Sequence, residues 1–147
     1  MSTYRQRLKE VVAQRGNLCV GIDPHPSLLS AWGLSLDASG LEAYCRTVVN
    51  GLGDVVAVFK PQVAFFEVYG SAGFAVLERL VASIREAGAL SILDAKRGDI
   101  GSTMQAYAEA FLAPGSPLAG DAVTVSPYLG FDSLMPAFER AIAFDKG

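Results

Sequence analysis

The stretch LDAKRGDIGST, residues 93–103, joins the end of an apolar run to a cluster of charged side chains. The run ALSILD (89–94) is typical of a buried strand, and Asp94, Lys96 and Asp99 lie within six residues at its end. Because side chains alternate along a strand, we expect Asp94 and Lys96 to point to the same side. The stretch therefore predicts a strand that carries a concentrated group of charges at its carboxyl end.

A second lysine, Lys60, ends the apolar run DVVAVFK (54–60), which predicts another strand. We expect Lys60, Asp94, Lys96 and Asp99 to form an alternating array of positive and negative side chains. Such an array keeps every member ionised, because each carboxylate has a cationic neighbour and each lysine an anionic one. A surface ion-pair network near a strand end is the alternative interpretation of the same spacing.

The two glycines and the arginine of this stretch are not expected to take part in the array. Gly98 and Gly101 are expected to serve the backbone geometry of the loop that follows the strand. Arg97 points opposite to Lys96 and is expected to lie outside the array.

The rest of the chain repeats the arrangement of an apolar run followed by an amphipathic segment. Apolar runs that predict strands occupy residues 17–22, 54–60, 89–94 and 121–126. Segments that predict helices occupy residues 3–15, 41–52, 71–87, 103–112 and 133–144, the second of them preceded by the capping-box spacing of Ser39 and Glu42.

Four consecutive strand–helix units are typical of either a doubly wound sheet or a (β/α)8 barrel, and both carry their chemistry at the carboxyl ends of the strands. The first strand is followed by GIDPHPS instead of a glycine fingerprint, which favours the barrel. We therefore expect an α/β chain with about the first four units of a (β/α)8 TIM barrel. Residues 1–147 would form the N-terminal half of a single barrel domain, either truncated or paired with another half, because an open half leaves strand edges exposed.

Composition excludes several classes of protein. The 147 residues are 51% hydrophobic and carry a net charge of −3, with no basic cluster, so a nucleic-acid partner is not expected. The apolar runs are too short to span a membrane, and the charged N-terminus is unlike a secretory signal. With only two cysteines, Cys19 and Cys45, a cytoplasmic location is expected. His25 is the only histidine, so a metal site or a histidine-based triad is not expected, and catalysis would rest on Asp, Glu and Lys.

Four segments together resemble the orotidine 5'-phosphate decarboxylase family. LDAKRGDIGST resembles its D-x-K-x-x-D-I-x-x-T signature, and LCVGIDPHP, FKPQVAFFEVYG and AVTVSPYLG agree in the same order with the bacterial branch that carries K-P-Q-x-A-F-F-E. The resemblance implies a (β/α)8 barrel that removes CO2 from orotidine 5'-monophosphate to give UMP in pyrimidine biosynthesis, with no metal or organic cofactor.

The resemblance also implies roles for the charged residues. Asp94 would lie against the substrate carboxylate, and Lys96 would protonate the carbon left after CO2 departs. Lys60 would bridge the ribose and Asp94. A preorganised cation is what a carbanion formed at the ring requires.

Further residues are implied to bind substrate. Asp23 would bind a ribose hydroxyl and Ser126 would contact the pyrimidine. The family forms homodimers with shared active sites, so Asp99, Ile100 and Thr103 would reach into the partner's site. The phosphate is gripped by loops late in the barrel, so we expect the isolated chain to be inactive, and robust turnover by it would disprove this expectation.

Three other functions remain open on the sequence. Hexulose-phosphate synthases and 3-keto-gulonate-phosphate decarboxylases share D-x-K-x-x-D but use Mg2+, and activity abolished by EDTA would favour them. A non-catalytic half-barrel is the second alternative. The third is a cell-adhesion module that uses the RGD tripeptide (97–99), which the absence of a signal peptide disfavours.

Overall fold

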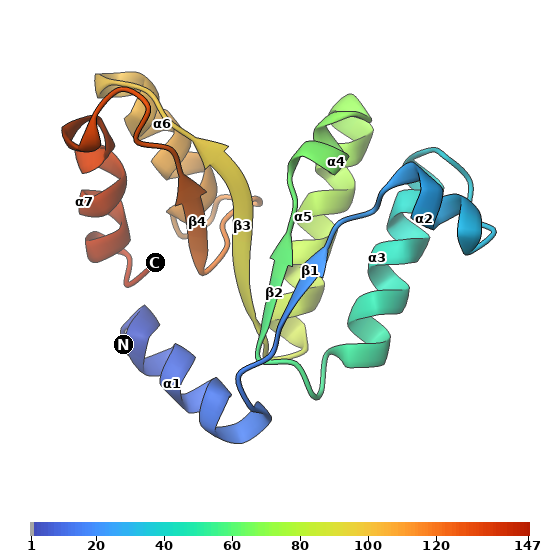
Figure 1. The fold of residues 1–147 in the computed structure, drawn as a ribbon. Helices are drawn as coiled ribbons and strands as arrows, with labels where there is room; N and C mark the ends of the chain where they lie inside the picture. Colours follow the sequence, from blue (N-terminus) through green and yellow to red (C-terminus); the bar gives the residue numbers. More distant parts are fainter. Residues whose placement is uncertain (1) are drawn as a thin grey trace.

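A computed structural model describes residues 2–147 and shows four parallel strands alternating with helices (Figure 1). The strands are β1 (Cys19–Ile22), β2 (Val58–Pro61), β3 (Leu90–Arg97) and β4 (Ala122–Val125). The helices are α1 (Tyr4–Arg15), α2 (Pro26–Ala31), α3 (Ala38–Leu52), α4 (Ala64–Glu67), α5 (Gly70–Glu86), α6 (Gly101–Leu112), the 3-10 helix η1 (Phe131–Leu134) and α7 (Met135–Ala143).

The strands pair in the order β1-β2-β3-β4, so each strand lies beside the next one along the chain. A doubly wound sheet reverses its strand order at a switch point, whereas a (β/α)8 barrel keeps the sequential order. The order found here confirms the expected α/β class and is that of four consecutive barrel units.

The outer face of the sheet is covered by helices. Ile22, Phe59 and Leu93 are fully buried in one cluster with Leu41 of α3 and Leu77 of α5. The amphipathic pattern of α3 and α5 predicted this packing, because each presents one apolar stripe to the strands.

The inner face of the sheet is covered at its base by α1, which lies below the strands in Figure 1. Val11 of α1 is buried with Val58 of β2 and Leu90 of β3. Since side chains alternate, Lys60 and Asp94 share this inner face with Val58 and Leu90, but lie farther along their strands. The helix therefore fills the amino end of the inner face and leaves the carboxyl end to the charged residues.

Some boundaries differ from those predicted. β2 begins at Val58 because residues 54–57 form the turn after α3, although their β-branched composition favours a strand. β3 continues through the charged residues to Arg97. The short helices α2 and α4 were not predicted, since one turn or two carry too little periodicity to be recognised.

The predicted capping box at Ser39 is also wrong. Asp37 is the N-cap of α3, and its carboxylate accepts hydrogen bonds from the backbone N–H groups of Ser39 and Gly40, at 2.9 and 3.0 Å. Glu42 instead pairs with Arg79 of α5. Among residues 2–147, no helix is long and apolar enough to cross a membrane.

Candidate active site

Three of the four predicted array residues meet at the carboxyl ends of β2 and β3. The ammonium of Lys60 lies 2.8 Å from Oδ2 of Asp94, and the ammonium of Lys96 lies 2.7 Å from Oδ1 of the same carboxylate. Each carboxylate oxygen of Asp94 therefore has its own lysine. Lys60, Asp94 and Lys96 therefore alternate in charge at these strand ends.

The backbone of β3 is irregular where it carries Lys96. The register of β3 against β4 shifts between Leu93 and Arg97, and Lys96 has a φ of 50°. A non-glycine residue at positive φ is strained, and a β-bulge of this kind re-aims a side chain at the end of a strand. The backbone N–H of Lys96 is held by the Thr124 hydroxyl at 3.0 Å, so β4 supports the strained conformation.

Two uncharged residues complete the hydrogen bonding of the array. The Thr124 hydroxyl donates to Oδ1 of Asp94 at 2.8 Å. The Gln62 amide donates to Oδ2 of Asp94 at 3.2 Å and accepts from the ammonium of Lys96 at 3.0 Å. Sequence analysis missed both as site residues. The available signal was position, since Gln62 and Thr124 lie near strand ends, two positions from Lys60 and Ser126 respectively.

The surroundings of Asp94 stabilise its charged form. The residue is buried, and burial alone raises the pKa of a carboxyl group. Hydrogen bonds from Lys60, Lys96 and Thr124 outweigh burial and hold the pKa of Asp94 well below its ordinary value. The hydrogen bond to Asp94 likewise raises the pKa of Lys60. The site therefore keeps a fixed anion between two lysines at neutral pH.

The predicted ribose- and pyrimidine-binding residues follow the two outer strands, β1 and β4, on either side of the strands that carry the array. Asp23 directly follows β1, and its Oδ1 is buried with no hydrogen-bond partner among the described residues. A buried acceptor without a donor is costly, so this oxygen is available to a ligand hydroxyl. Ser126 directly follows β4, and its backbone N–H donates to the carbonyl of Arg97 at 2.7 Å.

Asp99, Ile100 and Thr103 do not join the array. Oδ1 of Asp99 accepts from the backbone N–H of Ile100 at 2.7 Å, the side chain of Ile100 is 63% exposed, and Thr103 is exposed. Within residues 2–147, no hydrogen bond or ion pair links Asp99 to Lys60 or Lys96. A single chain therefore assembles three members of the expected array, not four.

Arg97 lies outside the array, as expected. Its guanidinium pairs with Glu67 of α4 and donates to the carbonyl of Ala95 at 3.1 Å. It also lies 5.5 Å from the ring centres of both Tyr107 and Phe111 on α6. Arg97 thus ties the end of β3 to the helices on its outer side.

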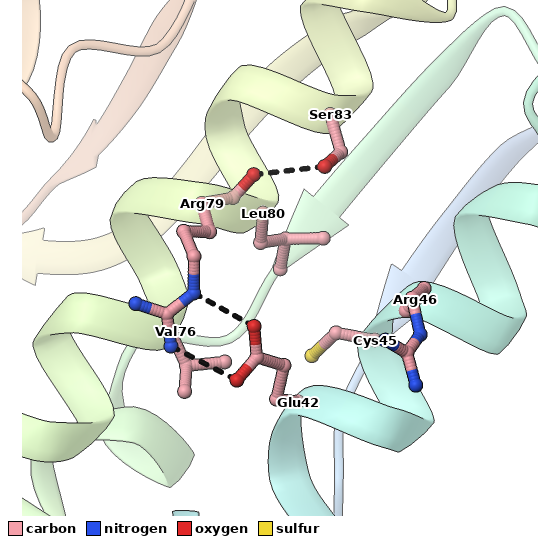
Figure 2. A pocket seen from close by; sticks show the side chains of 7 residues that line it. All are labelled: Glu42, Cys45, Arg46, Val76, Arg79, Leu80 and Ser83. Carbon is pink, nitrogen blue, oxygen red and sulfur yellow. Dashed lines mark hydrogen bonds and ion pairs between the residues drawn. The ribbon is translucent and has the colours of Figure 1, made fainter. Parts of the chain in front are cut away.

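A separate pocket of about 130 Å³ lies between α3 and α5 (Figure 2). Its rim carries the Glu42–Arg79 pair, joined by hydrogen bonds of 2.7 and 3.0 Å. Burial raises the pKa of Cys45 in its wall to about 12, so this thiol is not a reactive nucleophile. The pocket contains none of the array residues, and the array remains the candidate site.

The chain has the strand order of four consecutive α/β barrel units, with a Lys–Asp–Lys group at the strand ends. The model of the orotidine 5'-phosphate decarboxylase / HUMPS family matches residues 16–147. The chain belongs to this family.

Curated relatives agree with this assignment. The chain is 58% identical over 145 residues to an orotidine 5'-phosphate decarboxylase of Corynebacterium efficiens and covers 52% of it. It is 61% identical over 143 residues to the enzyme of the same name from Salinispora tropica and covers 51% of it. These matches take in 99% and 97% of this chain, which spans about half the length of these relatives.

Solved structures show the same relation. A crystal structure described as an orotidine 5'-phosphate decarboxylase from Streptomyces avermitilis superposes with a TM-score of 0.98 at 62% identity, and the match covers all of this chain and 52% of that one. The OMP decarboxylase of Leishmania donovani superposes with a TM-score of 0.78 at 35% identity, over 94% of this chain and 50% of that one.

Proposed function

We propose that this chain supplies the N-terminal half of a barrel that decarboxylates orotidine 5'-monophosphate to UMP and CO2 in pyrimidine biosynthesis. The observation that carries the proposal is the Lys60–Asp94–Lys96 group at the strand ends. Its support is the name shared by the curated relatives at 58% and 61% identity.

The geometry suits a decarboxylation that needs no cofactor. Asp94 is held ionised and would face the carboxylate of the bound substrate, which raises the energy of the ground state. When the bond from the ring carbon to the carboxylate breaks, the electron pair stays on the ring carbon and CO2 leaves. The ammonium of Lys96 would stabilise that developing charge and then give the carbon its proton. Lys60 holds the other oxygen of Asp94 in place.

The remaining substrate contacts come from neighbouring strand ends. The unpartnered Oδ1 of Asp23 is suited to a ribose hydroxyl, and Ser126 to the edge of the pyrimidine. The group that binds the phosphate would come from a C-terminal half. In support, Gly147 already pairs with the free edge of β4, because its N–H donates to Asp121 at 2.9 Å and its carbonyl accepts from Val123 at 3.1 Å. The edge of β4 can therefore pair with a parallel strand supplied by that half.

A homodimer with shared sites belongs to the same proposal. Asp99, Ile100 and Thr103 project from the end of β3 and the start of α6 without joining the array of their own chain. In a dimer they would complete the site of the partner. Both cysteines are free thiols, which suits the proposed cytoplasmic location.

The alternative within the family is a sugar-phosphate enzyme that uses Mg2+. The family description includes both kinds of enzyme, and the names of the curated relatives favour the decarboxylase. Activity that survives EDTA would support the proposal, and activity abolished by EDTA would favour the Mg2+-dependent alternative.

The proposal is tested by supplying the missing half. The chain would be mixed with the separately produced C-terminal half of the Streptomyces avermitilis relative, and loss of orotidine 5'-monophosphate would be followed. We expect no turnover from the chain alone and turnover from the mixture. Lys96→Ala should remove nearly all of it, at least ~100-fold, because a positioned acid contributes about that much or more.

Lys9→Ala, on an exposed position of α1, is the matched control and should leave the rate unchanged. A Lys96→Ala mixture that keeps the wild-type rate would exclude the proposed acid. Robust turnover by the isolated chain would contradict the half-barrel part of the proposal.

A further inference from the structure

Gln62 lies one residue beyond β2, between the strands that carry the array. Its backbone is fixed independently of its side chain, because its N–H donates to the carbonyl of Ile22 at 3.1 Å and its residue bridges to Asp94 in parallel pairing. The side chain is therefore directed from a rigid point toward the carboxyl ends of β2 and β3.

The amide of Gln62 contacts both charges of the Lys96–Asp94 pair. Nε2 donates to Oδ2 of Asp94 at 3.2 Å, and Oε1 accepts from the ammonium of Lys96 at 3.0 Å. An amide can donate to an anion and accept from a cation at the same time, whereas a carboxylate cannot donate and an ammonium cannot accept. The charges on either side also fix which way the amide is turned.

Lys96 needs such a second contact. Its side chain is 58% exposed, and a long flexible lysine bound to one oxygen alone can rotate about that contact. An ammonium has three N–H groups. Asp94 and Gln62 accept from two of them, which leaves the third with a defined direction.

We propose that Gln62 is a positioning residue that holds the Lys96 ammonium so that its third N–H faces the reacting carbon. The part of this inference that concerns the reaction rests on the proposed decarboxylation. The part that concerns the ordering of Lys96 does not, and it can be tested on this chain without substrate.

The first test measures the order of the Lys96 ammonium by 15N relaxation and hydrogen exchange of its NH3+ group in the 147-residue chain. Gln62→Met removes both hydrogen bonds at similar side-chain length. We expect the ammonium to become several-fold more mobile and to exchange several-fold faster, because one of its two acceptors is lost. Gln62→Glu keeps an acceptor for Lys96 and should retain the order.

Gln14→Met, at an exposed position of α1, is the matched control and should leave the Lys96 signal unchanged. Folding is not in question, because the backbone bonds of Gln62 remain, and a thermal melt of each variant checks this. Equal order of the ammonium in the wild type, Gln62→Met and Gln62→Glu would overturn the inference. Loss of order in Gln14→Met would overturn it as well.

The second test follows decarboxylation in the mixture with the C-terminal half. Gln62→Met should lower kcat by roughly ten- to hundredfold and change KM by less than about threefold, because misplacing the proton donor affects the transition state more than substrate binding. A raised KM with unchanged kcat would contradict the positioning role. If the wild-type mixture is inactive, the proposed function fails, and the ammonium measurement still decides the inference.

Discussion

Asp94 shows how a single buried carboxylate can be kept ionised. Its two oxygens receive hydrogen bonds from two lysines, a threonine and a glutamine. Removing the charge would leave Lys60 and Lys96 facing each other without an anion between them. The residue is therefore expected to contribute to stability as well as to the proposed chemistry.

Asp94→Asn tests this contribution. At pH 7 we expect a loss of about 1–3 kcal/mol in the free energy of unfolding, less than for a fully buried pair, because both lysines are partly exposed. A carboxyl group whose pKa is lowered by folding stabilises the protein above its unfolded value, near 3.8, and loses that contribution as pH falls.

The free energy of unfolding of the wild type should therefore approach that of Asp94→Asn below about pH 4. Urea unfolding at a series of pH values from neutral to acidic measures it. Asp132→Asn, at an exposed position in η1, is the control and should show little difference at any pH. If the free energies of unfolding of the wild type and Asp94→Asn differ by the same amount at every pH, the charge of Asp94 is not the cause of the lost stability.

The sequence predicted the charged members of the site better than the neutral ones. Regular alternation along β3 led us to expect Asp94 and Lys96 on one side, and they meet there although the backbone is irregular at Lys96. Lys60 was expected beside them because it lies at a strand end. Gln62 and Thr124 were missed because their roles depend on which neighbours the folded strands bring within 3 Å or so. The sequence alone does not show which partners a neutral side chain will bind, because these depend on the register of the strands.

At the scale of elements, the residues that follow β3 and β4 lie close together just beyond the array. A Cβ on Gly98 would clash with the carbonyl oxygen of Ser126. The same part of β3 contains the bulge and the positive φ of Lys96. The glycine is thus required by the packing of two strand ends, a more specific reason than the bending of a loop.

Gly98→Ala is expected to destabilise the chain by about 1–3 kcal/mol, because the added methyl group must push the end of β4 away from β3. Gly51→Ala is the matched control, since a Cβ there meets no atom within 4 Å and the residue lies within α3. It should be neutral or stabilise by about 0.5–1 kcal/mol. Thermal or urea unfolding compares the two, and equal stability of both variants would refute the close approach.

Helix ends show why local patterns alone were insufficient. Ser39 and Glu42 have the spacing of a capping box, yet Asp37 caps α3, and its pKa is lowered to about 2 by hydrogen bonds from Gly40, Ser39 and Ser35. The Asp37 cap and the Ser39–Glu42 spacing lie within a few residues of each other. Which of them begins the helix depends on the backbone conformation of the turn before it. Element types were predicted correctly for the long segments, whereas ends moved by two to four residues where turns compete.

At the scale of the whole molecule, the outer face of the sheet carries mainly packing residues, and the inner face also carries the charged array. The outer face packs against α3 and α5. On the inner face α1 covers the base, and the carboxyl end carries Lys60, Asp94 and Lys96. Strand order could be predicted, because GIDPHPS after the first strand, in place of a glycine fingerprint, favoured a barrel over a doubly wound sheet. The position of Asp99 outside the array could not, because it depends on the loop between β3 and α6, where the carboxylate accepts from the backbone N–H of Ile100.

The proposed shared site makes a prediction about mixed dimers. In the presence of the C-terminal half, Lys96→Ala and Asp99→Ala should each be nearly inactive. If each site combines Lys96 of one chain with Asp99 of the other, a dimer of the two variants contains one undamaged site and one doubly damaged site. Random exchange of subunits makes about half of the dimers mixed, so activity should recover to about one quarter of wild type.

The control is a mixture of Lys96→Ala with Lys60→Ala. Both substitutions affect the part of the site that one chain supplies, as the contacts of both lysines with Asp94 show. Every site in that mixture contains a Lys–Asp–Lys group that lacks one lysine, so no recovery of activity is expected. Recovery in the Lys96→Ala and Asp99→Ala mixture alone therefore requires Asp99 to act across the interface. Absence of recovery, once exchange of subunits has been shown with tagged chains, would mean that Asp99 has no role in the partner's site.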